Sequence, residues 1–234
     1  MSEGSIGIRE AVTILAKHHG PPPPLPTADP FELILWENVA YLASPARRLQ
    51  AFEQLRRTIG TAPAAILGAR RSVLEKVTSH GILKDAFAGK LRDCARIAVD
   101  ECGGDVGATL RRTPSRARQA LRSFPGIGEP GADKVLLFAG LGTDLAPDSN
   151  GLRVLVRLGL VREGGSYPRT YAASRRAAED LPAVPKARQE SHLLLRQHGQ
   201  TLCRRRLPRC SACPLEGRCA YARAERARAG RVTS

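Results

Sequence analysis

Apolar residues recur at every third or fourth position along most of the chain, and no stretch alternates long enough between apolar and polar residues to indicate a strand. This spacing is typical of amphipathic helices that bury one face. It predicts helices over residues 31–44, 45–60, 71–81, 83–104, 115–124, 133–141, 151–158, 169–181 and 188–198. The pattern therefore predicts an all-α protein.

Two irregular segments limit this helical region. The segment GPPPPLPTADP (Gly20–Pro30) is rich in proline, which cannot continue a helix and favours an extended arm. The C-terminal segment ARAERARAGRVTS is strongly basic, and we expect it to be a frayed tail. Between them, FELILWENVAYLAS is apolar on most faces, which indicates a buried helix. Its two polar residues, Glu37 and Asn38, therefore need a physical reason to be there.

The charge balance narrows the class of partner. The 234 residues include 37 Lys and Arg against 22 Asp and Glu, which gives a net charge of +15. Such an excess favours a polyanionic partner, most often nucleic acid, although a merely solvated basic surface has the same composition. Charged residues interrupt the first 20 positions, and no apolar run reaches membrane-spanning length. We therefore expect a cytoplasmic protein, associated with the nucleoid, that has no contact with a membrane.

Four of the six cysteines lie in one short segment, LCRRRLPRCSACPLEGRCAY, with six, two and five residues between them: Cys203, Cys210, Cys213 and Cys219. Thiolates are soft ligands that suit zinc or iron–sulfur clusters. Zinc sites usually join two short-spaced pairs across a longer segment, whereas one compact loop can enclose a [4Fe–4S] cluster. A cluster is the favoured interpretation and zinc the alternative. Cys94 and Cys102 stand apart, and we interpret them as small buried hydrophobes.

Arginines fill the interval between the first two of these cysteines, at Arg204, Arg205 and Arg206. Guanidinium groups on a rigid loop can bind phosphates. The metal centre would then act as a brace that holds a DNA-contacting loop in shape.

A second informative stretch is ALRSFPGIGEPGADKVLLFAG, in which an amphipathic segment ends at Phe124 and a new helix begins near Glu129 or Pro130. Gly126, Ile127 and Gly128 form the turn between them. Glycines permit a tight turn and expose backbone amides, which together with a helix N-terminus create an anion site. This arrangement is the helix-hairpin-helix solution for binding a DNA phosphate without reading a base.

With these motifs in this order, the chain resembles the endonuclease III family of DNA glycosylases, within the helix-hairpin-helix superfamily. The cysteine spacing matches the family's [4Fe–4S] loop, and PGIG matches its hairpin. PDSNGLRV resembles the segment with the catalytic aspartate, LLLRQHGQTLC the helix before the cluster, and DPFELIL the first barrel helix. The likeness runs from about residue 29 to residue 221.

The resemblance implies a division of the chain into three parts: an N-terminal helix and proline-rich arm (residues 1–29) that packs with the cluster domain, a six-helix barrel with the hairpin (30–143), and a [4Fe–4S] cluster domain with a basic tail (144–234). It implies that double-stranded DNA with a damaged or mismatched base is held across a cleft between the two domains. The target base would be flipped out for excision. We expect the protein to act as a monomer.

The resemblance also assigns the catalytic residues. Asp148 falls on the family's aspartate, which stabilises positive charge on the sugar or orients the nucleophile. The alternative is that Asp148 only caps the next helix. Bifunctional members of the family place a Schiff-base lysine where this chain has Pro130, which has no amine. Lys134 lies one turn further on and is the alternative nucleophile. The chain is therefore predicted to be a monofunctional glycosylase.

The identity of the excised base depends on weaker signals. Relatives that act on mismatched adenine hold a catalytic glutamate near this place, and an ungapped comparison puts it at Asn38, one position from Glu37. In an apolar pocket Glu37 would serve as an acid, and its alternative is an ion pair with an arginine such as Arg48. The family fills the gap left by the flipped base from two loops. Here the first loop has Leu42 in place of a glutamine, and the second offers Ile82 or Leu83 as an apolar wedge.

Two other functions remain open from the sequence. One is a bifunctional glycosylase and abasic-site lyase that uses another amine, such as Lys134. The other is a non-catalytic iron–sulfur module that binds DNA through the hairpin and the cysteine loop. Pro130 favours the binding module slightly, whereas retention of Asp148 favours the enzyme.

Overall fold

A computed structural model of the chain describes residues 6–232. Within this range the chain forms thirteen α-helices and two short 3-10 turns, and it forms no strand. The all-helical prediction is therefore confirmed. None of the described helices is long and apolar enough to cross a membrane.

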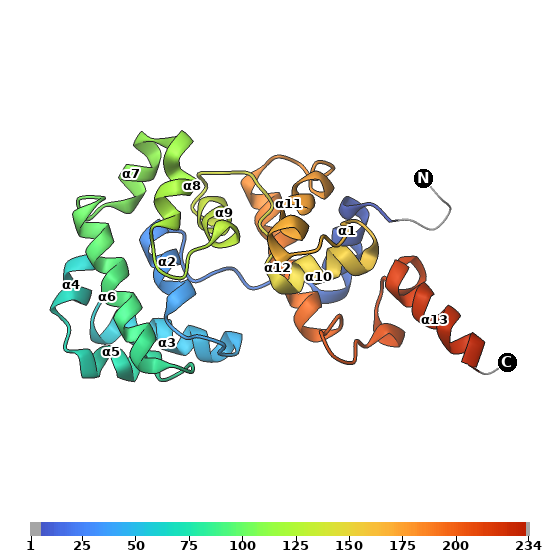
Figure 1. The fold of residues 1–234 in the computed structure, drawn as a ribbon, viewed down its shortest axis with the longest axis horizontal. Helices are drawn as coiled ribbons and strands as arrows, with labels where there is room; N and C mark the ends of the chain where they lie inside the picture. The colour runs from blue at the N-terminus through green and yellow to red at the C-terminus, as the bar shows by residue number, and fades with distance from the viewer. Residues whose placement is uncertain (1–5, 233–234) are drawn as a thin grey trace. The chain divides into compact units, whose positions relative to one another are not determined.

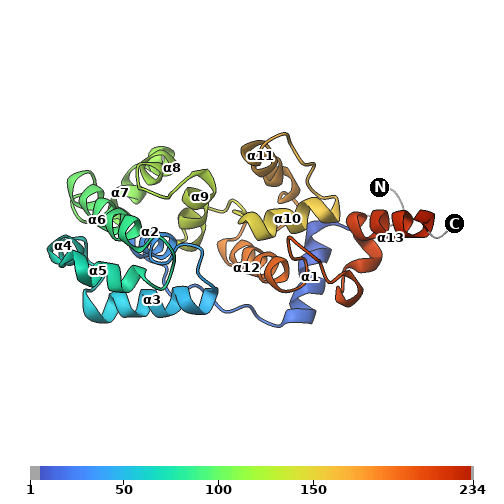
Figure 2. The ribbon, with the colours of Figure 1, turned by 60° about the horizontal axis from the view of Figure 1, so that its bottom comes forward.

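Contacts within the chain divide it into two compact units. The hairpin unit is Leu25–Gly142, and the cysteine unit combines the described residues before 25 with those after 142. In Figures 1 and 2 the N-terminal helix accordingly lies beside helices from the last third of the chain. The contact boundaries, 24/25 and 142/143, differ by a few residues from the proposed 29/30 and 143/144. The functional division into an arm, a barrel and a cluster domain stays a prediction.

The hairpin unit is built around α2, whose apolar residues are buried on all sides and which contacts α3, α6, α7 and α9. Buried apolar surface of this kind is the main stabilising contribution to a helical core. The helices are α2 (Pro30–Asn38), α3 (Pro45–Thr58), α4 (Pro63–Gly68), α5 (Arg71–Thr78), α6 (Lys84–Asp100), α7 (Val106–Arg112), α8 (Pro114–Arg122) and α9 (Glu129–Phe138).

The cysteine unit is built around α10 and α12, which make the most extensive helix contact in the chain's described part. The close approach depends on Gly199, because a Cβ there would lie 2.7 Å from the backbone oxygen of Asn150. Helix α1 packs on α12, and Leu15, Leu155 and Leu195 fill the shared core. The helices are α1 (Ile8–His19), α10 (Ser149–Leu158), α11 (Tyr167–Ala177), α12 (Pro185–Thr201) and α13 (Ala220–Val232).

Two predictions about the helices were wrong in part. The helix predicted over 31–44 ends at Asn38, because the chain turns sharply around Leu42, whose φ is +54°. The basic C-terminal segment, predicted to be frayed, instead continues α13 to Val232. Ala222 is buried in the core of the cysteine unit and anchors the start of this helix. Helices α4 and α7 were not predicted, since each is too short to show a clear period.

Candidate nucleic-acid interface and active site

The turn between α8 and α9 has the geometry that the sequence predicts for a hairpin. Gly126 has a φ of +78°, a left-handed conformation that favours glycine, and Gly128 has extended backbone before α9 begins at Glu129. The Ile127 amide donates to the Phe124 carbonyl oxygen across the turn at 3.1 Å, and the Ile127 side chain is buried. The amide and the side chain of Ile127 are thus both used within the turn.

Asn38 on α2 explains one polar residue of the apolar helix. Its side-chain Nδ2 donates to the Pro125 carbonyl oxygen at 2.9 Å and to the Ile34 carbonyl oxygen at 3.1 Å. A Cβ at Gly126 would lie 2.4 Å from Asn38 Oδ1. Since Asn38 is fully buried, this amide holds the hairpin turn against the core and leaves no room for a side chain at Gly126.

Gly126→Ala is expected to lower the free energy of unfolding by about 2 kcal/mol and to weaken binding to double-stranded DNA. The new Cβ would combine a strained φ with a collision against Asn38. Gly128→Ala is the matched control, because its Cβ would meet only Pro130 Cδ at 3.9 Å and its φ is negative. Chemical denaturation and DNA titration of both variants measure the difference. Equal stability of the two variants would contradict this account of the turn.

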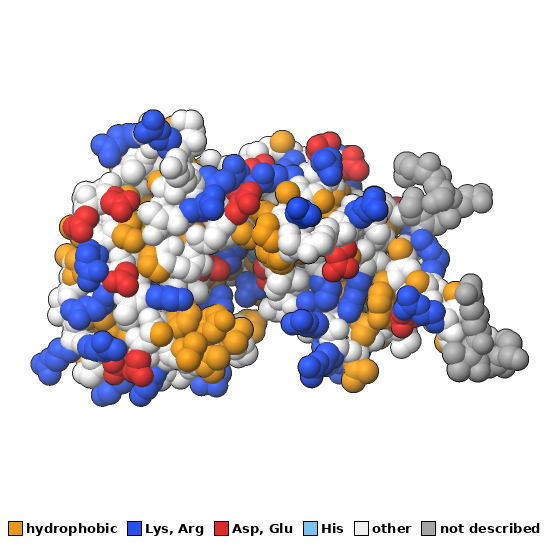
Figure 3. Space-filling model, in the orientation of Figure 1, with side chains coloured by type: hydrophobic (Ala, Val, Ile, Leu, Met, Phe, Trp, Pro, Cys, Tyr) orange, Lys and Arg blue, Asp and Glu red, His pale blue; other side chains and the backbone are white. Residues whose placement is uncertain are grey.

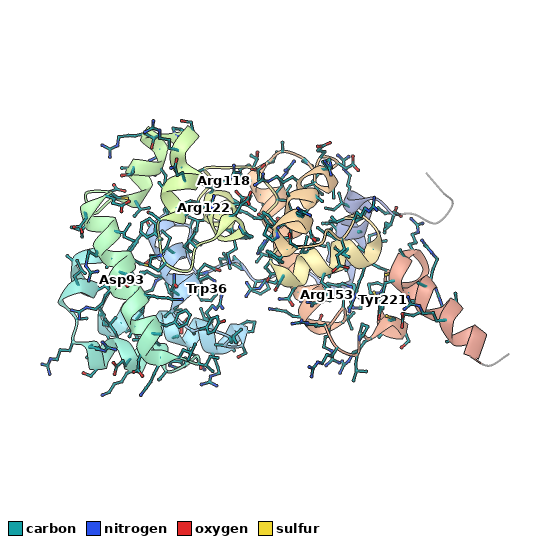
Figure 4. All side chains as sticks on the ribbon, viewed as in Figure 1. Trp36, Asp93, Arg118, Arg122, Arg153 and Tyr221 are labelled. Carbon is teal, nitrogen blue, oxygen red and sulfur yellow. The ribbon has the colours of Figure 1, made fainter. Side chains whose placement is uncertain are left out.

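The other polar residues of the hairpin are paired within the same unit. Asp133 of α9 accepts from Arg118 of α8, which is labelled in Figure 4, and this bond ties the two hairpin helices together. Lys134 of α9 is largely buried and its Nζ donates to Glu37 Oε1 of α2. Arg48 Nη1 lies 4.0 Å from the same Glu37 oxygen. The ion pair expected as an alternative for Glu37 is therefore present.

This pairing bears on two predicted roles. An amine that attacks the sugar must first be released from its ion pair and lose a proton. Two cations beside a carboxylate favour its ionised form, whereas a general acid needs the protonated form. Lys134 is therefore disfavoured as a Schiff-base residue. Glu37 lies within reach of Lys134, a group that can supply a proton.

Asp148 stands at the N-cap of α10, as the alternative reading of this residue expects. Its Oδ1 accepts from the backbone amides of Asn150 and Gly151, both at 2.9 Å. Its other oxygen, Oδ2, faces Asn150 Nδ2 and Arg196 Nε, both at 3.4 Å. One oxygen thus caps the helix while the other remains directed at side chains. Capping and catalysis are therefore compatible in this geometry.

Arg153 connects this acid to the cysteine loop. One guanidinium nitrogen, Nη2, donates to Asn150 Oδ1 at 2.9 Å and to the Gly199 carbonyl oxygen at 2.7 Å, while Nε donates to the Cys203 carbonyl oxygen at 2.9 Å (Figure 4). Burial lowers the pKa of Arg153, and Cys203 opposes that shift. Arg153 therefore links the backbone of Cys203 to the side chain of Asn150, which follows Asp148 by two positions.

The four predicted cysteines line one small cavity of about 20 Å³ in the cysteine unit. Cys213 Sγ lies 3.5 Å from His198 Nε2, and Cys219 Sγ donates to the Arg157 carbonyl oxygen at 3.3 Å. Arg157 Nη1 lies 3.4 Å from Cys203 Sγ. Burial raises the pKa of the Cys213 thiol to about 11, and burial together with His19 and His18 lowers the pKa of His198 to about 4. A cationic ligand would therefore favour deprotonation of the Cys213 thiol.

The spacing of the donors tests which ligand fits. Among the described residues, no three His, Cys, Asp or Glu side chains could together hold a single metal ion. A lone zinc ion needs four thiolates within about 2.3 Å of one point, whereas a cubane cluster accepts thiolates at its separate corners. Four sulfurs line this one cavity, beside Glu216 and His198, and a set of soft thiolates is the donor type that a [4Fe–4S] cluster takes.

The arginine segment is held by the same neighbourhood. Arg157 donates to the carbonyl oxygen of Arg204 at 2.7 Å and to that of Arg205 at 3.2 Å, and its guanidinium stacks on the Tyr221 ring at 4.6 Å. Arg204 is half-buried, whereas Arg205 and Arg206 are exposed. The fold therefore fixes the backbone of this segment and leaves two of its guanidinium groups at the surface.

The two loops predicted to carry the wedge are joined in the hairpin unit. The Ile82 amide donates to the Tyr41 carbonyl oxygen at 3.0 Å, and a Cβ at Gly81 would lie 2.4 Å from the Tyr41 amide nitrogen. Leu42, Ile82 and Leu83 are 71%, 53% and 61% exposed. Figure 3 shows apolar side chains gathered in a patch on this unit among basic ones. Both Leu42 and Leu83 have a positive φ, a strained conformation that is more common at functional sites.

Comparisons with known proteins agree with the motifs. No family model matches the chain. An endonuclease III from Sulfolobus acidocaldarius is 26% identical over 199 residues, which cover 83% of both proteins. A thymine-DNA glycosylase from Aeropyrum pernix is 23% identical over 83% of this chain and 84% of its own length. The structure of a non-covalent endonuclease III–DNA complex superposes with a TM-score of 0.76 at 21% identity, over 94% of this chain and 97% of the protein in that complex. The fold of that protein is therefore the fold of this chain.

Proposed function

We propose that this member of the endonuclease III family of DNA glycosylases removes a damaged or mismatched base from double-stranded DNA by hydrolysis of its N-glycosidic bond. The observation that carries the hydrolytic mechanism is the state of the amines on α9. Pro130 has none, and that of Lys134 is held by Glu37. Since neither Pro130 nor Lys134 offers an unengaged amine on α9, we assign water as the nucleophile and monofunctional chemistry to the enzyme.

In the proposed reaction, the bond between the base and the sugar C1′ breaks as water adds to C1′. Positive charge develops on the sugar, and the Asp148 carboxylate stabilises it and orients the water. The departing base gains a proton, and the water loses one. We assign delivery of the first proton to Glu37, which must first take up a proton from solvent because Lys134 and Arg48 favour its ionised form, and the proton lost by the water passes to solvent.

We further propose that Cys203, Cys210, Cys213 and Cys219 hold a [4Fe–4S] cluster. The soft donor set, the shared cavity and the cations around it support this assignment. The cluster supplies a rigid, charged centre that orders the loop. The chain's own contribution is to fix the backbone of Arg204 and Arg205 through Arg157.

DNA binding is assigned to four elements of the described chain. The hairpin amides at Gly126 and Gly128 bind a backbone phosphate, and Arg205 and Arg206 contribute charge from the cysteine loop, together with Arg204. Leu42 and Ile82 enter the base stack, where apolar wedges stabilise an unstacked step. The net charge of +15 favours association with a polyanion as a single chain.

A panel of lesion-bearing duplexes tests the proposed reaction. Because one relative is a thymine-DNA glycosylase, the panel includes G·T and G·U mismatches beside oxidised and alkylated bases. Each duplex is incubated with the enzyme and divided, and one half is treated with hot alkali. We expect strand cleavage only after alkali, which detects an abasic site left by hydrolysis. Cleavage without alkali would mean that an amine acts and would contradict monofunctional chemistry. Absence of abasic sites on every lesion would favour a binding module.

A further inference from the structure

An arginine that the reaction has not yet used lies against the candidate catalytic acid. Arg196 comes from α12, its side chain is only 15% exposed, and its Nε lies 3.4 Å from Asp148 Oδ2. The Nε atom is buried and makes no directed hydrogen bond. The contact is therefore an ion pair between the two groups.

Burial of a guanidinium group is costly unless an anion compensates it. The residues one helical turn from Arg196 on α12, at positions 192, 193, 199 and 200, include no acid, so its neighbours on the helix offer no compensation. Asp148 is the carboxylate that faces it. The pair therefore compensates a buried charge at the same point where the proposed reaction needs an anion.

Other groups around Asp148 act in the same electrostatic field. Arg153 of α10 is attracted to it, and Asp148 contributes to the raised pKa of Tyr167 on α11, of which burial is the larger cause. Arg153 already donates to Asn150, Gly199 and Cys203. Arg196 is thus a cation in ion-pair contact with the oxygen that does not cap the helix.

We propose that Arg196 is a positioning residue for catalysis, which keeps Asp148 ionised and fixes its Oδ2 toward the reacting sugar. This inference rests on the proposed function, because it assigns Asp148 a role in the reaction. The electrostatic part of the proposal, that Arg196 keeps Asp148 ionised, concerns Asp148 alone and can be tested without a substrate.

The sign of the expected pH effect follows from the pair. A neighbouring cation favours the ionised carboxylate, so removal of the cation raises the pH at which Asp148 takes up a proton. Activity that needs the carboxylate is lost as pH falls through that midpoint. In Arg196→Gln the acidic limb of the rate profile therefore moves to higher pH.

The experiment uses the full chain with its cluster and compares Arg196→Gln, Arg196→Lys and Arg188→Gln. Arg188 lies on the same helix and donates to the carbonyl oxygens of Leu181 and Pro182, so it is the matched control. The Asp148 carboxyl carbon is followed by NMR between acid and neutral pH and assigned with Asp148→Asn. Single-turnover excision is measured over the same range on the duplex found with the lesion panel.

We expect the Asp148 midpoint of Arg196→Gln to rise by about one pH unit or more. Excision at neutral pH should fall roughly 10- to 100-fold, because the carboxylate loses its fixed position. Arg196→Lys should keep the midpoint close to wild type and recover part of the rate, and Arg188→Gln should match wild type in both.

Two outcomes overturn the inference: an unchanged midpoint in Arg196→Gln, or an unchanged rate and pH profile while wild type excises the base. If Arg196→Gln does not fold, Arg196→Lys decides, since an unchanged excision rate in that variant would deny any need for the guanidinium position. A raised midpoint together with no excision by wild type on any lesion would support the ion pair as the control of Asp148 while the proposed function fails.

Discussion

Asp148→Asn is expected to lower the rate of base removal by about 100- to 1000-fold while the chain still folds and binds DNA, with a reduced free energy of unfolding because Arg196 loses its anion. Asparagine is as good an N-cap as aspartate, so the bonds from the Asn150 and Gly151 amides to Oδ1 survive the change. What disappears is the negative charge beside the sugar. The variant therefore separates the two roles that the position combines, which Asp148→Ala would not do.

A matched control exists on α7. Asp105 is an N-cap that accepts from the Ala108 amide at 2.7 Å, and it lies in the hairpin unit. Asp105→Asn removes the same charge from the same kind of position, and we expect wild-type excision. Thermal unfolding, DNA titration and single-turnover excision are measured for both variants. Excision by Asp148→Asn at the wild-type rate would leave the residue with its capping role alone.

The sequence predicts those parts of the site that local rules determine. The hairpin follows from a proline, two glycines and the flanking amphipathic segments, and the structure has Gly126 in the left-handed region that such a turn needs. The capping role of Asp148 follows from its place before a helical period. The cysteine loop follows from spacing, and its four thiols line one cavity.

Pairings between distant segments could not be predicted in the same way. Glu37 and Lys134 are 97 positions apart, and no local pattern indicates that their helices place them in contact. Asn38 was an unexplained polar residue in the sequence, and only its contact with the Pro125 carbonyl oxygen gives it a role. Arg196 belongs to the same class, because its helix shows no signal that one arginine faces inward.

The end of the chain was predicted wrongly for a related reason. The final segment alternates alanine with charged residues, and its composition alone resembles a solvated tail. Alanine is nevertheless the strongest helix former, and Ala222 finds a buried place beside the cysteine loop. The high helix propensity of alanine therefore favours this helix, and the burial of Ala222 anchors it to the cysteine unit.

Cys213→Ser is expected to abolish the brown colour of the protein and to lower the free energy of unfolding of the cysteine unit by more than about 4 kcal/mol. The binding energy of a metal centre is folding energy when the apo loop has little else to order it. The loop between Cys203 and Cys219 contains only two 3-10 turns, and its cysteines pack against the core of the unit. Without the cluster, the arginine segment and the start of α13 lose their support.

Cys102→Ser provides the comparison. This buried thiol lies in the hairpin unit, outside the loop, and its change should cost about 1–3 kcal/mol while the colour and iron content stay at wild type. Iron and sulfide are determined for both variants after anaerobic expression, and unfolding is followed by circular dichroism.

If Cys213→Ser keeps full colour and stability, or if the wild-type protein made anaerobically contains zinc and no iron, the cluster assignment is wrong. The distinction matters for DNA binding, because Arg157 ties the backbone of Arg204 and Arg205 to the same cysteines. Loss of the cluster should therefore weaken DNA binding even in a protein that retains Asp148. The arginine segment would no longer be ordered before binding, and ordering it on the DNA phosphates would cost free energy.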